Sequence, residues 1–382
     1  MAERCAVIGV GQTKHASKRI DVSIAGLVRE AALAALADAG IGWADVDAVV
    51  IGKAPDMFEG VMMPELYLAD ALGATGRPML RVHTAGSVGG STAIVAAHLV
   101  MAGVHRRVLT VAFEKQSDSD AMWALTMRTP FQLPVVAGAG GYFAPIVRQY
   151  IERSGAPLDT GVRVAVKDRL NALRNPYAHL HLEDISAEKV AESPMLWDPI
   201  RYLECCPSSD GACAMVLAAE DAVTGTPAWI HATAMRSEPT MFAGRDEVNP
   251  LAGRECAADL YRQAGIAEPR REIDVAEVYV PFSWFEPMWM ENLGFAPERE
   301  GWQVTMSGAT ALDGDLPVNP SGGVLSSNPI GASGMLRFAE AAMQVRGQAG
   351  EHQVDGARLA LGHAYGGGSQ FFAMWIVSDR RP

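Results

Sequence analysis

Cysteine is scarce in this chain, which has 382 residues and 5 cysteines. The number is odd, and no Cys-x-x-Cys pair is present; the positions are Cys5, Cys205, Cys206, Cys213 and Cys256. Such a sparse set argues against a disulfide framework and against a structural zinc site. We therefore expect reduced thiols, and with them a cytoplasmic protein.

Long apolar runs and an excess of basic residues are also missing. No stretch reaches the ~18 apolar residues that a membrane span needs, and the opening MAERCAVIGV lacks the layout of a signal peptide. Lys and Arg number 32 against 44 Asp and Glu, a net charge of −12, which argues against a nucleic-acid partner. Hydrophobic residues make up 49% of the chain, a globular composition, and the length suggests about two domains.

The order of apolar segments predicts a layered α/β protein with a mostly parallel sheet. Residues 5–12 are typical of a buried strand, and residues 21–39 of an Ala/Leu-rich helix closed by Gly40. A strand over 47–51, a helix over 87–103 and a strand from 107 follow. This alternation of strands and helices indicates an α/β fold.

Two segments of the chain recur in the same order. Residues 29–41 resemble residues 254–266, at an offset of 225 residues, and each is followed by an apolar strand. The start of a helix at Gly89 is likewise echoed at Gly331. We interpret this as a duplication, with one half in residues 1–224 and the other in 225–382. Residues 115–200 have no counterpart and form an inserted segment that covers a site or builds a subunit contact.

The sequence gives little support for a metal-binding or dinucleotide-binding site. His179 and His181 lie in a polar segment without further ligands at useful spacing. Gly9 and Gly11 follow the first strand, but the third glycine and the acidic residue of a dinucleotide-binding motif are missing. We expect no metal.

Two glycine-flanked turns precede predicted helices. Ser87 stands at a turn where a side chain could act as a nucleophile or help hold an oxyanion, although a serine there is also an ordinary helix N-cap. Ser321 and Asn328 flank a pair of Gly-rich turns whose backbone can approach a neighbouring group or ligand closely. The alternative is that both are ordinary turn residues.

Two further candidates follow apolar strands. Tyr279 precedes a Pro-constrained turn, and the alternative is a strand-end tyrosine with a buried ring. His363 and Tyr365 precede three glycines, and His363 can exchange protons near neutral pH unless it faces solvent in a hairpin. All these segments lie at strand ends of one predicted sheet.

The chain resembles the thiolase superfamily, and within it the sterol-carrier-protein-type branch. The resemblance covers nearly the whole chain, and the Gly-rich end and six motifs carry it: Gly86-Ser-Val-Gly-Gly-Ser-Thr, Phe113-Glu-Lys, Cys205-Cys-Pro-Ser-Ser-Asp-Gly-Ala, Glu277-Val-Tyr-Val-Pro-Phe-Ser, Asn319-Pro-Ser-Gly-Gly and Asn328-Pro-Ile-Gly-Ala-Ser-Gly. It implies a duplicated five-layer α/β/α/β/α fold.

The departures from the family pattern bear on the reaction. Ser87 stands where thiolases have their nucleophilic cysteine, and Asn328 stands where they have a histidine. Tyr279 replaces the family's Asn or His, and the second cysteine falls near Ala364. A serine hydroxyl without an evident base is a poor substitute for a thiolate. Cys205 and Cys206 are set aside as distant from the nucleophile position.

Within the family the chain looks most like the lipid-transfer-protein-type aldolases of steroid-degrading actinobacteria. This resemblance implies retro-aldol cleavage of a β-hydroxyacyl-CoA thioester of a steroid side chain, with propionyl-CoA as product. It also implies a homodimer, with the Phe113-Glu-Lys strand near the contact, and a small OB-fold/zinc-ribbon partner that would carry any zinc. CoA enters as part of the substrate, and no cofactor is expected.

The resemblance suggests roles for the candidate residues. Asn328, Tyr279 and an ordered water would hold the enolate oxygen. His363, or else Tyr279 or Tyr365, would be the base, Ser87 would fill space and hydrogen-bond, and Ser321 would support the site. The alternatives are a non-catalytic acyl-CoA-binding subunit, and a thiolase or acyltransferase with an atypical nucleophile.

Overall fold

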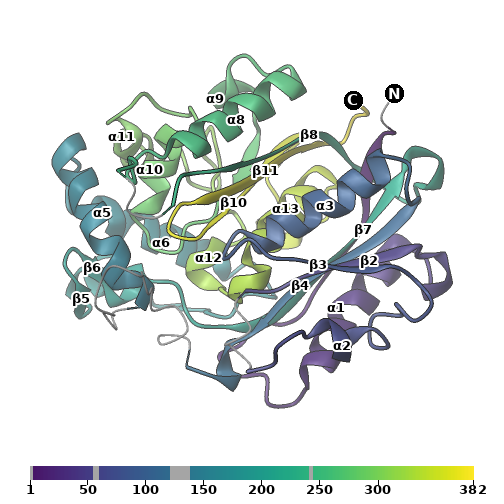
Figure 1. Ribbon diagram of the computed structural model, residues 1–382. Coiled ribbons are helices and arrows are strands. Elements are labelled where there is room, and N and C mark those ends of the chain that lie inside the picture. Colours follow the sequence, from purple (N-terminus) through teal and green to yellow (C-terminus); the bar gives the residue numbers. More distant parts are fainter. Residues whose placement is uncertain (1–2, 55–59, 121–137, 241–243) are drawn as a thin grey trace.

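A nine-stranded mixed sheet runs through the protein (Figure 1). The computed structural model describes residues 3–54, 60–120, 138–240 and 244–382. From one edge to the other the strands are β3 (Met79–Val82), β2 (Ala48–Gly52), β4 (Arg107–Lys115), β7 (Asp210–Ala219), β1 (Cys5–Gln12), β8 (Ala228–Ser237), β11 (Phe371–Ser378), β10 (Leu359–Gly366) and β9 (Val275–Glu277).

The strand order repeats in mirror image about the centre of the sheet. β1 pairs antiparallel with β8, through Ala6 opposite Trp229 and Val7 opposite Ala228. Moving outward, β7, β4 and β2 follow on one side, and β11, β10 and β9 on the other. Both β2–β4 and β9–β10 are parallel pairs, whereas β1–β7 and β8–β11 are antiparallel. The two sides of the sheet therefore share one topology.

Helices complete five layers. Helix α1 (Ile24–Ala39) packs on one face of β1, β4 and β7, and α8 (Leu251–Ala264) packs on the outer face of β8 and β11. Helices α3 (Val88–Met101) and α13 (Ile330–Val345) contact each other and lie between the strands of the two halves (Figure 1). The predicted α/β/α/β/α arrangement is confirmed. The expectation of a mostly parallel sheet is wrong, because five of the eight neighbouring pairs of described strands are antiparallel and the parallel pairs lie toward the two edges.

Glycines allow α3 and α13 to touch through their backbones. A Cβ on Gly89 would lie 2.4 Å from the backbone nitrogen of Met335, and one on Gly334 would lie 2.9 Å from the nitrogen of Gly90. Real Cβ atoms do not approach so closely, so any side chain here would push the helices apart. This contact fixes the two halves of the chain against each other at the centre.

The predicted insertion contributes a separate group of elements beside the sheet (Figure 1). Its residues 121–137 lie outside the described ranges. The rest forms α5 (Gly138–Ser154), α6 (Thr160–Ala172), α7 (Ala187–Glu192), β5 (Met195–Trp197) and β6 (Ile200–Arg201). The shorter helices elsewhere are α2 (Glu65–Leu68), α9 (Pro269–Glu272), α10 (Phe285–Asn292), α11 (Gly301–Met306) and α12 (Gly323–Ser326).

None of the helices in the described ranges is long and apolar enough to cross a membrane.

Candidate active site

Residues from both halves meet where β9, β10, α3 and α13 approach one another. Tyr279 follows β9, Tyr365 lies in β10, and their rings pack edge to face with centroids 5.2 Å apart. The Tyr279 hydroxyl lies 3.5 Å from Oδ1 of Asn328, just before α13. A Cβ on Gly86, just before Ser87 and α3, would lie 3.9 Å from the same hydroxyl. The structure thus brings these four predicted segments together.

The turn at Ser87 is tightly held. Ala85 adopts a left-handed conformation, with φ of 51°, which is uncommon for a residue with a side chain. The Ser87 hydroxyl is fully buried and donates to the Thr84 carbonyl at 2.7 Å, so it does not cap α3. A Cβ on Gly366 would lie 2.3 Å from the Ser87 nitrogen. The end of β10 therefore packs directly on this turn, backbone to backbone.

Asn328 is oriented by contacts on both ends of its amide. Oδ1 accepts a hydrogen bond from the Ser333 hydroxyl at 2.8 Å, and Nδ2 donates to Sγ of Cys206 at 3.2 Å. The backbone N–H donates to Oγ of Ser209 at 3.1 Å, and the carbonyl accepts from Gln116. A thiol is a weak hydrogen-bond acceptor, so Nδ2 of Asn328 can give up this contact and donate to an oxygen of a ligand at little cost in free energy.

His363 is buried rather than solvent-facing. β10 continues to Gly366, so His363 and Tyr365 point to the same face and their rings lie nearly parallel, with centroids 6.3 Å apart. Its Nδ1 accepts the backbone N–H of Tyr279 at 3.3 Å. Burial lowers the pKa of His363 to about 3. The expectation that His363 exchanges protons near neutral pH does not fit this environment; its contact instead positions Tyr279.

Both tyrosines are held in their neutral form. Burial raises the pKa of Tyr279 and of Tyr365 above its ordinary value of 10, and the proximity of Tyr279 raises that of Tyr365 further. A buried neutral phenol can donate a hydrogen bond at neutral pH, and it gives up its proton only to a group more basic than itself, such as the carbon of an enolate. It is not a ready proton acceptor.

Ser321 belongs to a buried ionic cluster next to Tyr279. Its backbone N–H and hydroxyl donate to the carboxylate of Glu277, at 3.1 and 2.9 Å. Arg337 donates to the Ser321 hydroxyl at 2.7 Å and forms a salt bridge with Glu277. Because Glu277 is two residues before Tyr279, the cluster supports the end of β9, and Ser321 acts through it rather than on a ligand.

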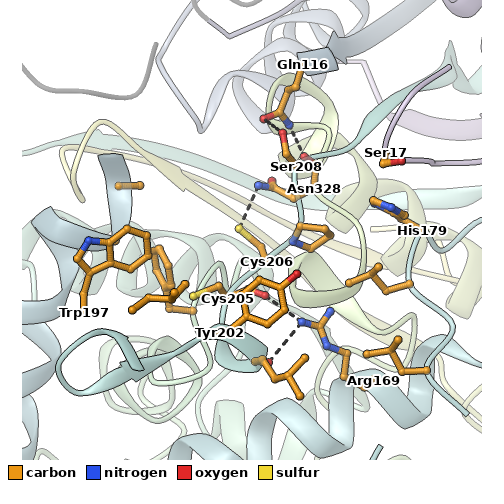
Figure 2. Close-up of a pocket in the computed structure, with 18 residues that line it drawn as sticks. Ser17, Gln116, Arg169, His179, Trp197, Tyr202, Cys205, Cys206, Ser208 and Asn328 are labelled. Carbon is orange, nitrogen blue, oxygen red and sulfur yellow. Dashed lines mark hydrogen bonds between the residues drawn. The ribbon is translucent and has the colours of Figure 1, made fainter. Parts of the chain in front are cut away.

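A pocket of about 560 Å³ reaches Asn328 (Figure 2). Most of its lining is apolar. The insertion contributes Ala139, Gly140, Leu180, Leu182, Leu196 and Trp197, and the segment that follows it contributes Tyr202 and Leu203. The polar side is made by Ser17, Gln116, Arg169, His179, Ser208 and Asn328. The guanidinium of Arg169 donates hydrogen bonds to the backbone carbonyls of Leu203, Cys205 and Leu325. A mostly apolar pocket with a few convergent polar groups is typical of a binding site for an organic molecule.

Two pocket residues were not among the sequence-based candidates. Cys206 was set aside as distant from the nucleophile position at Ser87, and the structure places its thiol against Asn328 instead. Burial raises the pKa of this thiol to about 11. His179 lines the same pocket, with Nδ1 2.8 Å from the Ser209 hydroxyl. Only tertiary packing brings the insertion and the 205–209 loop to Asn328.

Within the described ranges, no group of three or more His, Cys, Asp or Glu side chains could hold a metal ion.

Comparisons with known proteins define the class. A family described as "Thiolase C-terminal domain-like" matches residues 234–379. An acetyl-CoA acetyltransferase of Methanothermobacter thermautotrophicus is 33% identical, over 98% of this chain and 99% of its own. The chain therefore belongs to the thiolase superfamily.

Further similarities narrow the branch. Human sterol carrier protein 2 is 30% identical, over 95% of this chain and 70% of its own length. A solved structure described as "Ltp2-ChsH2(DUF35) aldolase" superposes with a TM-score of 0.84 at 26% identity, covering 100% of this chain and 99% of that one. The protein is a member of the sterol-carrier-protein-2-type branch.

Proposed function

We propose that the protein is a carbon–carbon lyase that cleaves a β-hydroxyacyl-CoA thioester of a steroid side chain in a retro-aldol step. The observation that carries the proposal is the pair of buried phenols beside Asn328, at the turn where Ser87 stands. The Ser87 hydroxyl is occupied by the Thr84 carbonyl, and no base contacts it in the described part of the chain. A site with proton donors and no activated nucleophile suits lyase chemistry better than acyl transfer. The similarity to the Ltp2-ChsH2 aldolase supports the same conclusion.

Two groups of the substrate take part in the reaction: the β-hydroxyl loses a proton, and the thioester oxygen takes up negative charge. The hydroxyl proton passes to water in the pocket, the Cα–Cβ bond breaks, and the β-carbon becomes the carbonyl of the steroid product. The bonding electrons form the enolate of a short acyl-CoA, with charge on the thioester oxygen. Donors aimed at that oxygen lower the barrier. We assign this role to Nδ2 of Asn328 and the Tyr279 hydroxyl, which lie next to each other.

Tyr365 completes the cycle. As a neutral buried phenol it gives its proton to the α-carbon of the enolate, releasing propionyl-CoA, and then recovers a proton from water. His363 contributes by accepting the backbone N–H of Tyr279, which fixes the position of that ring.

The shape of the pocket supports a bulky apolar substrate. Its volume of about 560 Å³ lies within the range of sites for drug-sized ligands, and Leu182, Leu196 and Trp197 give it an apolar wall. We therefore assign the steroid part of the substrate to this side, with CoA remaining attached to the short acyl product and no separate cofactor.

We also propose two kinds of subunit contact. The Ltp2-ChsH2(DUF35) structure includes a second protein, and by analogy we expect a small OB-fold/zinc-ribbon partner that would hold any zinc. A homodimer would form through the edge strand β3, where Leu80 is exposed. The ion pair between Arg81 and Glu65 joins this strand to α2, whose Leu66 and Tyr67 are also exposed. The Phe113-Glu-Lys strand itself lies inside the sheet, between β2 and β7.

The proposal is tested by product analysis. The purified chain, alone and with its partner, is incubated with a β-hydroxyacyl-CoA derived from a steroid side chain, and products are identified by mass spectrometry. We expect a steroid carbonyl product and propionyl-CoA, with strong losses in Tyr279→Phe and Asn328→Ala and little change in Ser87→Ala. Absence of product in both preparations contradicts the proposal.

A second candidate function rests on Cys206. Its thiol contacts Asn328 in the pocket, so a thiolase or acyltransferase could use it as an atypical nucleophile. The raised pKa of this thiol disfavours the thiolate that acyl transfer needs. Acyl transfer to free CoA that disappears in Cys206→Ser would establish this function, and binding of acyl-CoA without any turnover would indicate a non-catalytic subunit.

A further inference from the structure

His179 reaches the candidate active site from the insertion. It follows α6, lines the same pocket as Asn328, and is half-buried there (Figure 2). Its Nδ1 lies 2.8 Å from the Ser209 hydroxyl, and that hydroxyl oxygen accepts the backbone N–H of Asn328. The imidazole is thus connected to Asn328 through a single side chain.

The surroundings of Ser209 determine which ring nitrogen of His179 carries the proton. Ser209 is fully buried, and a buried hydroxyl needs an acceptor for its hydrogen. Among the described residues, Nδ1 of His179 is the one acceptor within hydrogen-bond distance of this hydroxyl. The serine therefore donates to Nδ1, and the proton of the neutral ring is on Nε2.

Nε2 is left available for a ligand. The hydrogen bonds of His179 to the described residues use its backbone N–H and Nδ1 and not Nε2, although the ring lines the pocket. Burial and the nearby charges of Arg169 and Lys14 lower the pKa of His179, so the ring is neutral at pH 7. A neutral imidazole with a fixed N–H can polarise a carbonyl oxygen without giving up its proton.

We propose that His179 is a further substrate-contacting residue of this site, whose Nε2–H, oriented by Ser209, donates a hydrogen bond to the thioester carbonyl oxygen of the bound acyl-CoA. This deepens the proposed function, since the same oxygen bears the enolate charge. His179 then joins Nδ2 of Asn328 and the Tyr279 hydroxyl as a third donor to this oxygen, and Ser209 contacts both His179 and Asn328.

Two ligands separate this contact from general packing. Propionyl-CoA has the thioester oxygen, and S-propyl-CoA, a thioether, lacks it. The dissociation constants of both are measured by titration calorimetry with the full chain, in complex with its partner if the two co-purify. In His179→Leu we expect propionyl-CoA to bind roughly tenfold more weakly, the effect of one hydrogen bond left unmade, and S-propyl-CoA to bind as before.

Two variants serve as controls. His179→Gln keeps a donor near the position of Nε2 and should restore most of the affinity for propionyl-CoA. His181→Gln alters an exposed histidine outside the pocket and should change neither ligand. Equal weakening of both ligands in a His179→Leu protein of normal melting temperature, or no weakening of propionyl-CoA, refutes the inference. Failure of the wild type to bind propionyl-CoA refutes it as well.

The outcome is independent of the retro-aldol assay. If turnover fails but the thioester-dependent loss is seen, the acyl-CoA contact stands and the lyase proposal falls. If turnover succeeds and the loss is missing, the lyase proposal stands and His179 has no contact with the thioester.

Discussion

Removing Arg337 tests the electrostatics that support the end of β9. Its guanidinium and the carboxylate of Glu277 are both almost fully buried, and they form a salt bridge that also includes the Ser321 hydroxyl. In Arg337→Met the carboxylate loses its positive partner and keeps its two hydrogen bonds from Ser321. Truncating one partner of a buried pair typically costs about 3–5 kcal/mol of unfolding free energy. The charge of Arg337 also helps to lower the pKa of Glu340, but in the variant Glu340 keeps its contact with Nε2 of His352 at 2.9 Å.

The cost should depend on pH in a defined direction. Burial already raises the pKa of Glu277, and loss of Arg337 raises it further. A carboxyl group whose pKa is raised on folding stabilises the folded state below its unfolded pKa of about 4.3, and this contribution is lost as the pH rises toward the folded pKa. Arg337→Met should therefore be less destabilising at pH 5 than at pH 8.

Urea unfolding at the two pH values measures the effect. Adding Glu277→Gln to Arg337→Met should recover a large part of the loss, because the neutral amide needs no counter-charge. Arg271→Met, which breaks a largely exposed pair with Glu268, should cost less than about 1 kcal/mol. A cost near that of Arg271→Met, or one that Glu277→Gln does not reduce, would refute the reasoning.

Three further outcomes are expected. Tyr365→Phe should lower turnover by ~100-fold or more with little change in KM. Tyr261 serves as the control, because its hydroxyl donates to the Leu293 carbonyl away from the site, and Tyr261→Phe should keep turnover. Equal losses of turnover in the two variants in steady-state assays would contradict the proton-donor role of Tyr365. Cys206→Ser should keep retro-aldol turnover, and intact-mass spectra of wild type with substrate should show no acylated protein. Because the pKa of His363 falls on folding, stability should decrease as the pH drops below about 6.5, by at most about 1.4 kcal/mol per pH unit from this group; His363→Phe should reduce that slope in urea titrations.

The fold could be predicted because its main signals are local. Gly40 and Gly265 end their helices in the left-handed conformation, with φ of 66° and 70°, and the echo of 29–41 in 254–266 marks equivalent helices. Strands that are equivalent in two copies of one topology must end at corresponding places. The echo of Gly89 in Gly331 likewise marks α3 and α13 as equivalent, which explains why Ser87 and Asn328, just before these helices, could be expected to lie close together.

The environment of each group could not be predicted in the same way. His363 was expected at a turn, but packing of Gly366 on the Ser87 turn extends β10 and buries the ring. His179 and Cys206 come from segments whose sequence has no period that fixes their direction. Their place beside Asn328 depends on contacts between residues more than a hundred positions apart.

The contact between α3 and α13 restricts which residues this protein can exchange. At Gly89 and Gly334 the helices meet without side chains, so any substitution there would force the two halves apart. The pocket wall formed by the insertion carries no such constraint: exchanging Leu182 or Leu196 for another apolar residue alters the space for the substrate and leaves the helix contact as it is. Selection for a new acyl chain would therefore act on residues 138–200, while the chemistry at the centre stays constant.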